Sequence, residues 1–120
     1  MPHATILYAE DNRLLRLTIT EMLEEEGWAV DACPDGNAAL NRLAGGSRYD
    51  LLLLDADLPG ATGIELTRYA RSLLIYRRTP IIILSATDCS AQARKAGADL
   101  FLCKPEGVMA LVDAVRRLTD

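Results

Sequence analysis

Four consecutive leucines, Leu51 to Leu54, followed directly by Asp55, constrain the fold more than any other feature of this chain. A short run that is apolar at every position favours a strand buried on both faces, as in a parallel sheet covered by helices. In open α/β sheets, ligands bind outside the carboxyl ends of the strands. Asp55 therefore stands where a carboxylate can serve as a nucleophile or as a metal ligand.

Three other short apolar runs also end at polar side chains. Residues 6–9 lead to Glu10-Asp11, residues 81–84 lead to Ser85, and residues 101–103 lead to Lys104. If these runs are neighbouring parallel strands, two acids, a nucleophilic acid, a hydroxyl and an ammonium group converge on one edge of the sheet. This set suits phosphoryl transfer, because cations must neutralise the charge of the phosphoryl oxygens before a carboxylate can approach.

Turn and capping signals divide the chain into five alternating strands and helices. Strands are expected near residues 4–9, 28–33, 51–54, 81–84 and 101–103, and helices near 12–26, 35–43, 64–74, 89–96 and at the end of the chain. This alternation predicts the α/β class: a doubly wound, five-stranded parallel sheet with right-handed crossovers and five flanking helices. The 120 residues fit one domain, spanning residues 1–120.

Two of the expected helices differ in the apolar face that they offer to the core. Residues 89–96 offer only three small side chains at helical spacing, those of Cys89, Ala93 and Ala96. Small side chains bury little area, so this helix should be weakly held. The last helix carries a fuller stripe at positions i, i+3, i+4 and i+7, namely Val108, Leu111, Val112 and Val115.

Composition and charge limit the class of protein and its partners. Half of the residues are hydrophobic and a quarter are charged, which is typical of a globular chain. No apolar run approaches the roughly 20 residues of a membrane helix, and Met1-Pro2-His3 is too short to be a signal peptide, so a cytoplasmic protein without membrane contact is expected. A net charge of −4 argues against direct nucleic-acid binding by this domain.

The three cysteines are odd in number and lie far apart, at Cys33, Cys89 and Cys103. They lack the paired spacing of a zinc site. We interpret them as small buried or half-buried residues of a protein in a reducing compartment.

The ordered motifs resemble those of the receiver domain of bacterial two-component response regulators. They are Glu10-Asp11, Asp55 with Leu58-Pro59-Gly60, Ser85-Ala86 and Lys104-Pro105, each after an expected strand. The resemblance covers essentially the whole chain. It implies the flavodoxin-like strand order 2-1-3-4-5 and a phosphoprotein of phosphorelay signal transduction. The implied partners are a histidine kinase or a histidine phosphotransfer protein, followed by an unknown output domain or effector protein.

The resemblance also implies roles for the site residues. Asp55 would become an aspartyl phosphate, with Lys104 and Ser85 contacting the phosphoryl oxygens. Magnesium prefers six oxygen ligands and keeps several waters. Asp11 and Asp55 would bind it directly, Glu10 through water, and the backbone carbonyl of Asp57 would be a further ligand. Taken singly, each residue has a simpler interpretation: acids cap helices, Ser85 could be a turn residue, and Lys104 a solvated lysine.

Two surface features suggest how the domain would communicate. Phe101, three residues before Lys104, stands where the family places an aromatic switch residue. When Ser85 moves toward the phosphate, the ring would have space to turn inward. In the first expected helix, a buried apolar face is already formed by Leu15, Ile19, Met22 and Leu23, so Leu14 and Leu17 are expected to face solvent. Exposed leucines at i and i+3 beside the acidic site would suit a partner helix.

Two other functions remain open from the sequence. The pattern of four apolar residues and Asp55-Ala56-Asp57 also resembles the nucleophile motif of haloacid dehalogenase-like magnesium-dependent phosphohydrolases, in which the second acid acts as general acid and base. Pro59 and the lack of an acidic pair at a strand end after Lys104 weigh against it. A receiver-like binding module that works without phosphate is the second alternative. In a receiver, Asp57 lies two positions beyond the phosphoacceptor Asp55, where it flanks the path of an attacking water and is expected to alter the lifetime of the phosphoaspartate.

Overall fold

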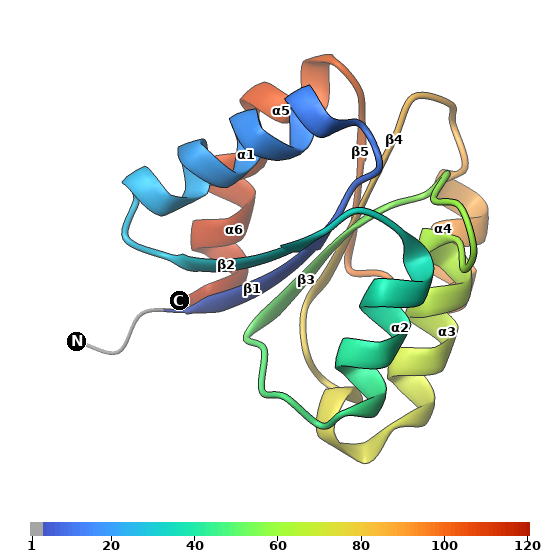
Figure 1. Cartoon of the computed structure of the whole chain (residues 1–120). Coiled ribbons are helices and arrows are strands. Elements are labelled where there is room, and N and C mark those ends of the chain that lie inside the picture. The colour runs from blue at the N-terminus through green and yellow to red at the C-terminus, as the bar shows by residue number, and fades with distance from the viewer. Residues whose placement is uncertain (1–3) are drawn as a thin grey trace.

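The protein forms one five-stranded parallel sheet with helices on both faces, in a computed structural model that describes residues 4–120 (Figure 1). Its strands are β1 (Thr5–Ala9), β2 (Ala29–Cys33), β3 (Leu51–Asp55), β4 (Ile81–Ser85) and β5 (Leu100–Cys103). They lie in the order β2-β1-β3-β4-β5, with every neighbouring pair parallel. The predicted doubly wound, flavodoxin-like α/β fold is therefore confirmed.

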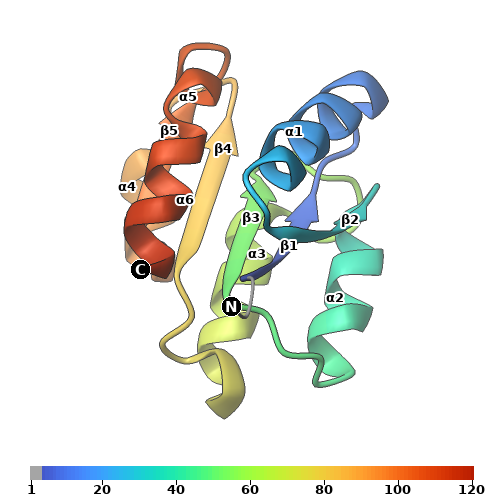
Figure 2. The ribbon, with the colours of Figure 1, turned by 90° about the vertical axis from the view of Figure 1, so that its left-hand side faces the viewer.

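The helices are divided between the two faces of the sheet. They are α1 (Arg13–Glu25), α2 (Gly36–Ala44), α3 (Gly63–Ser72), the 3-10 helix η1 (Leu74–Tyr76), α4 (Ser90–Ala96), α5 (Glu106–Met109) and α6 (Leu111–Thr119). Helices α1 and α6 pack on one face, which Figure 2 turns toward the viewer, and α2, α3 and α4 pack on the other. All five predicted helical regions are present, and the last is divided into two.

The central strands explain the unbroken apolar runs of the sequence. Every residue of β3 and of β4 is buried. Successive side chains of a strand point to opposite faces, so Leu51 and Leu53 enter the core under α1 and α6, and Leu52 and Leu54 enter the other core. A strand between two helical layers has no solvent-facing side, which is why leucine occupies all four positions.

Side-chain caps fix where the first two helices begin. The Asn12 Oδ1 atom accepts a hydrogen bond of 3.0 Å from the Leu15 N–H at the start of α1. The Asp35 Oδ1 atom accepts one of 2.7 Å from the Ala38 N–H at the start of α2, as predicted. Both satisfy backbone donors that a helix leaves without partners in its first turn.

Two helix ends differ from the prediction. The helix expected to reach Leu74 ends at Ser72, because Leu73 is extended and Leu74 begins η1 with a largely exposed side chain. The final helix is interrupted at Ala110, whose N–H bonds to the Gly107 carbonyl in the tighter 3-10 manner. In α6 the buried residues are Leu111, Ala114 and Val115, whereas Val112 is half-buried.

The cysteine prediction was wrong for one residue. Cys33 is buried and Cys89 half-buried, but Cys103 is exposed, because it ends an edge strand where no neighbour covers it. The inner face of α4 is as expected, since Ala93 and Ala96 are its buried residues. Met1-Pro2-His3, on which the signal-peptide argument depends, lies outside the described residues. Within residues 4–120, no helix combines the length and the apolarity needed to span a membrane.

Candidate functional site

The carboxyl edge of the sheet brings the predicted polar groups together. The strand register aligns Ala9 with Leu54 and Asp55 with Leu84, so the residues that follow these strands lie side by side. The Lys104 Nζ atom lies 2.9 Å from Glu10 Oε1 and 3.2 Å from Asp55 Oδ2. Residues from the ends of β1, β3 and β5 thus meet in one ion-pair cluster.

Glu10 is completely buried at this edge. Its Oε2 atom accepts a hydrogen bond of 3.1 Å from the Asn12 N–H, and its Oε1 atom accepts the Lys104 bond. Burial raises the pKa of Glu10 above its ordinary value, and the Asp55 charge adds to this, although the Lys104 hydrogen bond opposes it. The side chain is therefore held in one place by two donors and depends on the Lys104 charge.

Lys104 supplies the positive charge of the cluster. Burial lowers the pKa of its ammonium group, but the Glu10 hydrogen bond and the Asp55 charge outweigh burial and leave it raised. The Lys104 N–H also donates a 2.7 Å hydrogen bond to the Ser85 carbonyl, which fixes the backbone where β5 ends. The ammonium group consequently stays charged and close to two carboxylates.

Asp55 is held from its own loop. Its side chain is almost fully buried, and its Oδ1 atom accepts a 3.1 Å hydrogen bond from the Asp57 N–H. The first residue of α3 approaches closely: a Cβ atom at Gly63 would lie 2.4 Å from the Asp55 carbonyl oxygen. Glycine at this position allows α3 to begin directly against the end of β3.

Three carboxylates form a possible metal site. One oxygen atom from each of Glu10, Asp11 and Asp55 lies within 4.8 Å of the other two, with Asp11 exposed to solvent. An all-oxygen donor set with one open side suits Mg²⁺, which keeps part of its water shell. The residues present therefore fit the predicted ion.

The predicted hydroxyl lies on the other side of Asp55. Ser85 is fully buried, and its Oγ atom accepts a 3.2 Å hydrogen bond from the Thr87 N–H. Asp57 is exposed, and its Oδ2 atom lies 3.4 Å from Ser85 Oγ. The side chains of Asp57 and Ser85 therefore lie together at the carboxyl ends of β3 and β4.

Phe101 lies on β5, the strand next to β4, which ends at Ser85. It is half-buried, it pairs with Ile83 in the register of β4 and β5, and it packs against the core beneath α3 and α4. A hollow of about 190 Å³ lies beside the ring, between β5 and the residues Ala93 and Arg94 of α4. The ring thus borders space next to the helix with the smallest buried side chains.

Two residues that support the site, Arg16 and Tyr8, were not predicted from the sequence. Arg16 Nη1 donates a 2.8 Å hydrogen bond to the Glu10 carbonyl, tying the first turns of α1 to the end of β1. Tyr8 lies two residues before Glu10 and is buried on the same face of β1. The two-residue period of a strand could have identified Tyr8, whereas no pattern in the sequence indicates the Arg16 contact.

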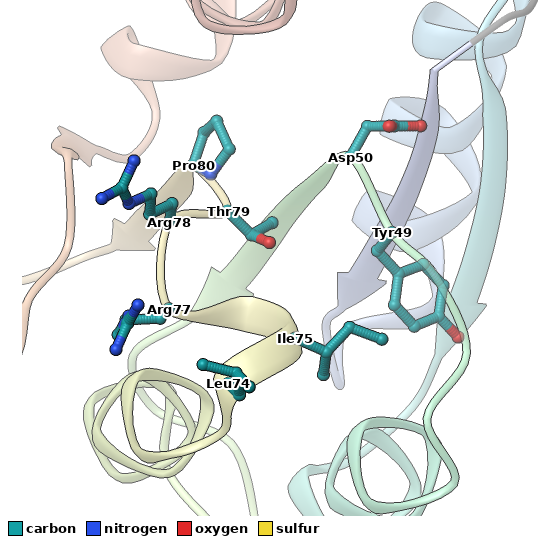
Figure 3. Close-up of a pocket in the computed structure, with 8 residues that line it drawn as sticks. All are labelled: Tyr49, Asp50, Leu74, Ile75, Arg77, Arg78, Thr79 and Pro80. Carbon is teal, nitrogen blue, oxygen red and sulfur yellow. The ribbon is translucent and has the colours of Figure 1, made fainter.

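A larger hollow, of about 340 Å³, lies at the opposite edge of the sheet and contains none of the site residues. Figure 3 shows Ile75 and Tyr49 on its two sides, with Leu74 on the same 3-10 helix as Ile75. The chemistry therefore does not coincide with this hollow. Leu74 and Ile75 are exposed apolar residues far from the site, unlike the exposed Leu14 and Leu17 of α1.

Comparison with known proteins identifies the family. The family model of the response regulator receiver domain matches residues 6–116. The chain belongs to the response regulator receiver family. It is 34% identical over 128 residues to the alkaline phosphatase synthesis transcriptional regulatory protein SphR of Synechococcus elongatus, covering 98% of this chain and 49% of that protein.

Solved receiver structures agree with this assignment. The Francisella response regulator 1452 receiver domain matches with a TM-score of 0.87 and 32% identity, over 98% of this chain and 97% of that one. The receiver domain of the sensor histidine kinase PA1611 of Pseudomonas aeruginosa PAO1 also matches with a TM-score of 0.87, at 31% identity over 98% of each chain. The latter is described with a magnesium ion coordinated in its active-site cleft.

The receiver assignment argues against the haloacid dehalogenase-like alternative. A haloacid dehalogenase-like site would need an acidic pair at a strand end after Lys104, but Glu106 lies on α5 and Asp113 on α6. The acids of this receiver instead follow β1. The chain spans about half the length of curated relatives such as SphR and the PdtaR protein of Mycobacterium tuberculosis.

Proposed function

We propose that Asp55 accepts a phosphoryl group from a phosphohistidine of a histidine kinase or of a histidine phosphotransfer protein. An Asp55 carboxylate oxygen forms the new bond to phosphorus, and the bond between phosphorus and the histidine nitrogen breaks. The histidine keeps the bonding electron pair, and Asp55 becomes an aspartyl phosphate. The observation that carries this proposal is the Lys104 ammonium within 3.2 Å of both Glu10 and Asp55, two buried carboxylates.

Mg²⁺ would be held by Asp11 and Asp55 directly, by Glu10 through water, and by the backbone carbonyl of Asp57. Bound there, it neutralises the negative charge of the phosphoryl oxygens. The cluster of three carboxylate oxygens supports this assignment for the three side chains. The Asp57 carbonyl is assigned by the family resemblance.

Lys104 and Ser85 would bind the phosphoryl oxygens. Lys104 already contacts the Asp55 carboxylate, so its ammonium needs to shift only slightly to contact a phosphoryl group there. The Ser85 hydroxyl can donate to a second oxygen by releasing its long, 3.4 Å hydrogen bond to the Asp57 Oδ2 atom, while its oxygen goes on accepting from the Thr87 N–H. Together these groups hold charge in place around the transferred group without rearranging the backbone.

Phosphorylation would reach the surface through Ser85 and Phe101. The side chains of Ser85 and Phe101 point to the same face of the sheet. Phe101 pairs with Ile83 across β4 and β5, and Ser85 lies two residues after Ile83 on β4. A shift of Ser85 toward the phosphate would free space for the Phe101 ring to turn inward. Helix α4, held by small side chains, would then repack and change the surface offered to an output partner.

Leu14 and Leu17 would form the contact with the phosphodonor protein. They are 75% and 52% exposed, on the helix that begins directly after Glu10 and Asp11. An apolar pair beside the acidic site suits a helix of the kinase or phosphotransfer protein, because its histidine must come within bonding distance of Asp55. The receiver would thus select its donor with α1.

Asp57 would tune the lifetime of the aspartyl phosphate. Its exposed carboxylate lies beside Ser85, at the open side of the site. Comparing dephosphorylation of the native protein and of Asp57→Asn tests this role. Equal rates would show that Asp57 only shapes the loop.

The wider setting follows from these roles. We propose that residues 1–120 act as a single receiver domain in the cytoplasm, without binding nucleic acid or membrane themselves. The net charge of −4 supports the proposed lack of nucleic-acid binding, because such binding usually needs a basic face.

Intact mass measured after incubation with acetyl phosphate tests the function. We expect a magnesium-dependent phosphoryl adduct on the native chain and none on Asp55→Ala. Rapid release of phosphate without an adduct would favour a phosphohydrolase. Neither adduct nor release would favour a binding module that works without phosphate.

A further inference from the structure

Tyr8 lies directly beneath the ion-pair cluster of the site. The register pairs Tyr8 of β1 with Leu53 of β3, and both side chains belong to the core under α1 and α6. Two residues further along the same strands come Glu10 and Asp55. Because side chains two residues apart share a face, the phenol ring packs under these two carboxylates.

The hydroxyl of this ring is unusual for a buried tyrosine. Tyr8 is only 1% exposed, and within residues 4–120 its hydroxyl oxygen has no hydrogen-bond partner. Buried tyrosine hydroxyls normally find one. A phenol is protonated at neutral pH, so the Tyr8 hydroxyl can act as a donor. A donor without a partner thus lies beside carboxylates that can each accept further hydrogen bonds.

The proposed reaction changes what Glu10 needs. Before phosphorylation, Lys104 divides its ammonium group between Glu10 and Asp55. Once Asp55 carries a phosphoryl group, the ammonium turns to the phosphoryl oxygens, and Glu10 retains the Asn12 N–H as its donor from the described residues, besides the water of the proposed Mg²⁺ site. A fully buried carboxylate that loses a donor is strongly destabilised.

We propose that Tyr8 is a positioning residue, whose hydroxyl donates to the Glu10 carboxylate as Lys104 transfers its contact to the phosphoryl group. This inference rests on phosphorylation of Asp55. Tyr8 touches neither the phosphodonor nor the reacting atoms. It acts through Glu10, by lowering the cost of releasing Lys104.

The substitution Tyr8→Phe tests the inference, because it removes one oxygen atom and keeps the ring. Thr20→Val is the matched control, since Thr20 on α1 has the other buried hydroxyl without a hydrogen-bond partner in the described residues. The rate of adduct formation with acetyl phosphate is measured by intact mass over a series of Mg²⁺ concentrations. The native chain is measured in parallel.

We expect the maximal rate of Tyr8→Phe to fall about tenfold, the effect of losing one hydrogen bond to a charged group. The Mg²⁺ concentration that gives half the maximal rate stays unchanged, and so does the maximal rate of Thr20→Val. A native maximal rate in Tyr8→Phe would overturn the inference while leaving the proposed function intact. Absence of an adduct on the native chain would overturn both.

A second measurement decides the question if Tyr8→Phe does not fold. Beryllofluoride with Mg²⁺ serves as a stable substitute for the phosphoryl group on the native protein. A hydrogen bond from a phenol to a carboxylate shifts tyrosine absorption to longer wavelength. We expect this shift when beryllofluoride is added, and unchanged tyrosine absorption would contradict the inference.

Discussion

The Lys104 ammonium lies 2.9 Å from the Glu10 carboxylate, joining two residues 94 positions apart in the chain. Glu10 is inaccessible to solvent, and the Lys104 side chain is only 18% exposed. The pair therefore differs from the ion pairs of the protein surface, whose attraction water largely screens. It connects the end of β1 to the end of β5 across the strands between them.

Replacing Lys104 by methionine should destabilise the fold. The change keeps the length of the side chain but leaves a buried carboxylate without its cation, which typically costs about 3 kcal/mol or more of unfolding free energy. Urea unfolding without Mg²⁺ measures this cost. The exposed lysine of α4 provides the control, because Lys95→Met should change the unfolding free energy little. Equal stability of the two variants would show that the buried pair contributes nothing.

Mg²⁺ should stabilise the native protein through the three-carboxylate cluster. Above the dissociation constant, each tenfold rise in free Mg²⁺ is expected to add about 1.4 kcal/mol to the unfolding free energy. Asp11→Asn removes one ligand charge and should shift this dependence to higher Mg²⁺ concentration. The exposed Glu21 of α1 gives the control, Glu21→Gln. A common Mg²⁺ dependence for the two variants would remove Asp11 from the metal site.

The secondary structure was largely predictable because local signals agreed with the tertiary fold. The Asp35 cap and the four leucines of β3 each appear in the sequence as they act in the structure. The break at Ala110 was not predictable, because neither glycine nor proline occupies that position. It arises where α5 packs against β5: a Cβ at Gly107 would lie 2.7 Å from that of Leu102.

The residues of the site were predictable from the sequence, but the contacts between their side chains were not. Parallel strands bring their carboxyl ends to one edge of the sheet, so Glu10, Asp55 and Lys104 were predicted to lie at the same edge. That Lys104 pairs with Glu10 as well as Asp55 depends on side-chain rotamers chosen by packing, which no spacing encodes. Tyr8 was counted as one more apolar residue of a strand, because an aromatic in such a run normally only fills the core.

Phe101→Ala should separate phosphorylation from its effect on the surface. Adduct formation at Asp55 is expected to proceed at the native rate, because the ring lies outside the site. Beryllofluoride should change amide hydrogen exchange along α4 in the native protein and leave it unchanged in the variant. Leu102→Ala, which alters the opposite face of β5, should keep the response. An α4 response of native size in Phe101→Ala would reject Phe101 as the switch.

Replacing both Leu14 and Leu17 by alanine should slow phosphotransfer from a histidine phosphotransfer protein about tenfold or more, since apolar contact area is lost. Phosphorylation by acetyl phosphate, which needs no protein contact, should be unaffected. Leu74 and Ile75 are also exposed but lie at the far edge of the sheet (Figure 3), so the double substitution Leu74→Ala, Ile75→Ala is the matched control. If phosphotransfer is slowed equally in both double variants, the phosphodonor protein does not bind at α1.

Identifying the phosphorylated residue tests the receiver chemistry most directly. Borohydride reduces an aspartyl phosphate to homoserine, and peptide sequencing by mass spectrometry then locates it. After treatment with acetyl phosphate and Mg²⁺, we expect homoserine at position 55 and nowhere else. Homoserine at Asp57 or Asp11, or at no position despite a phosphoryl adduct, would contradict the role assigned to Asp55.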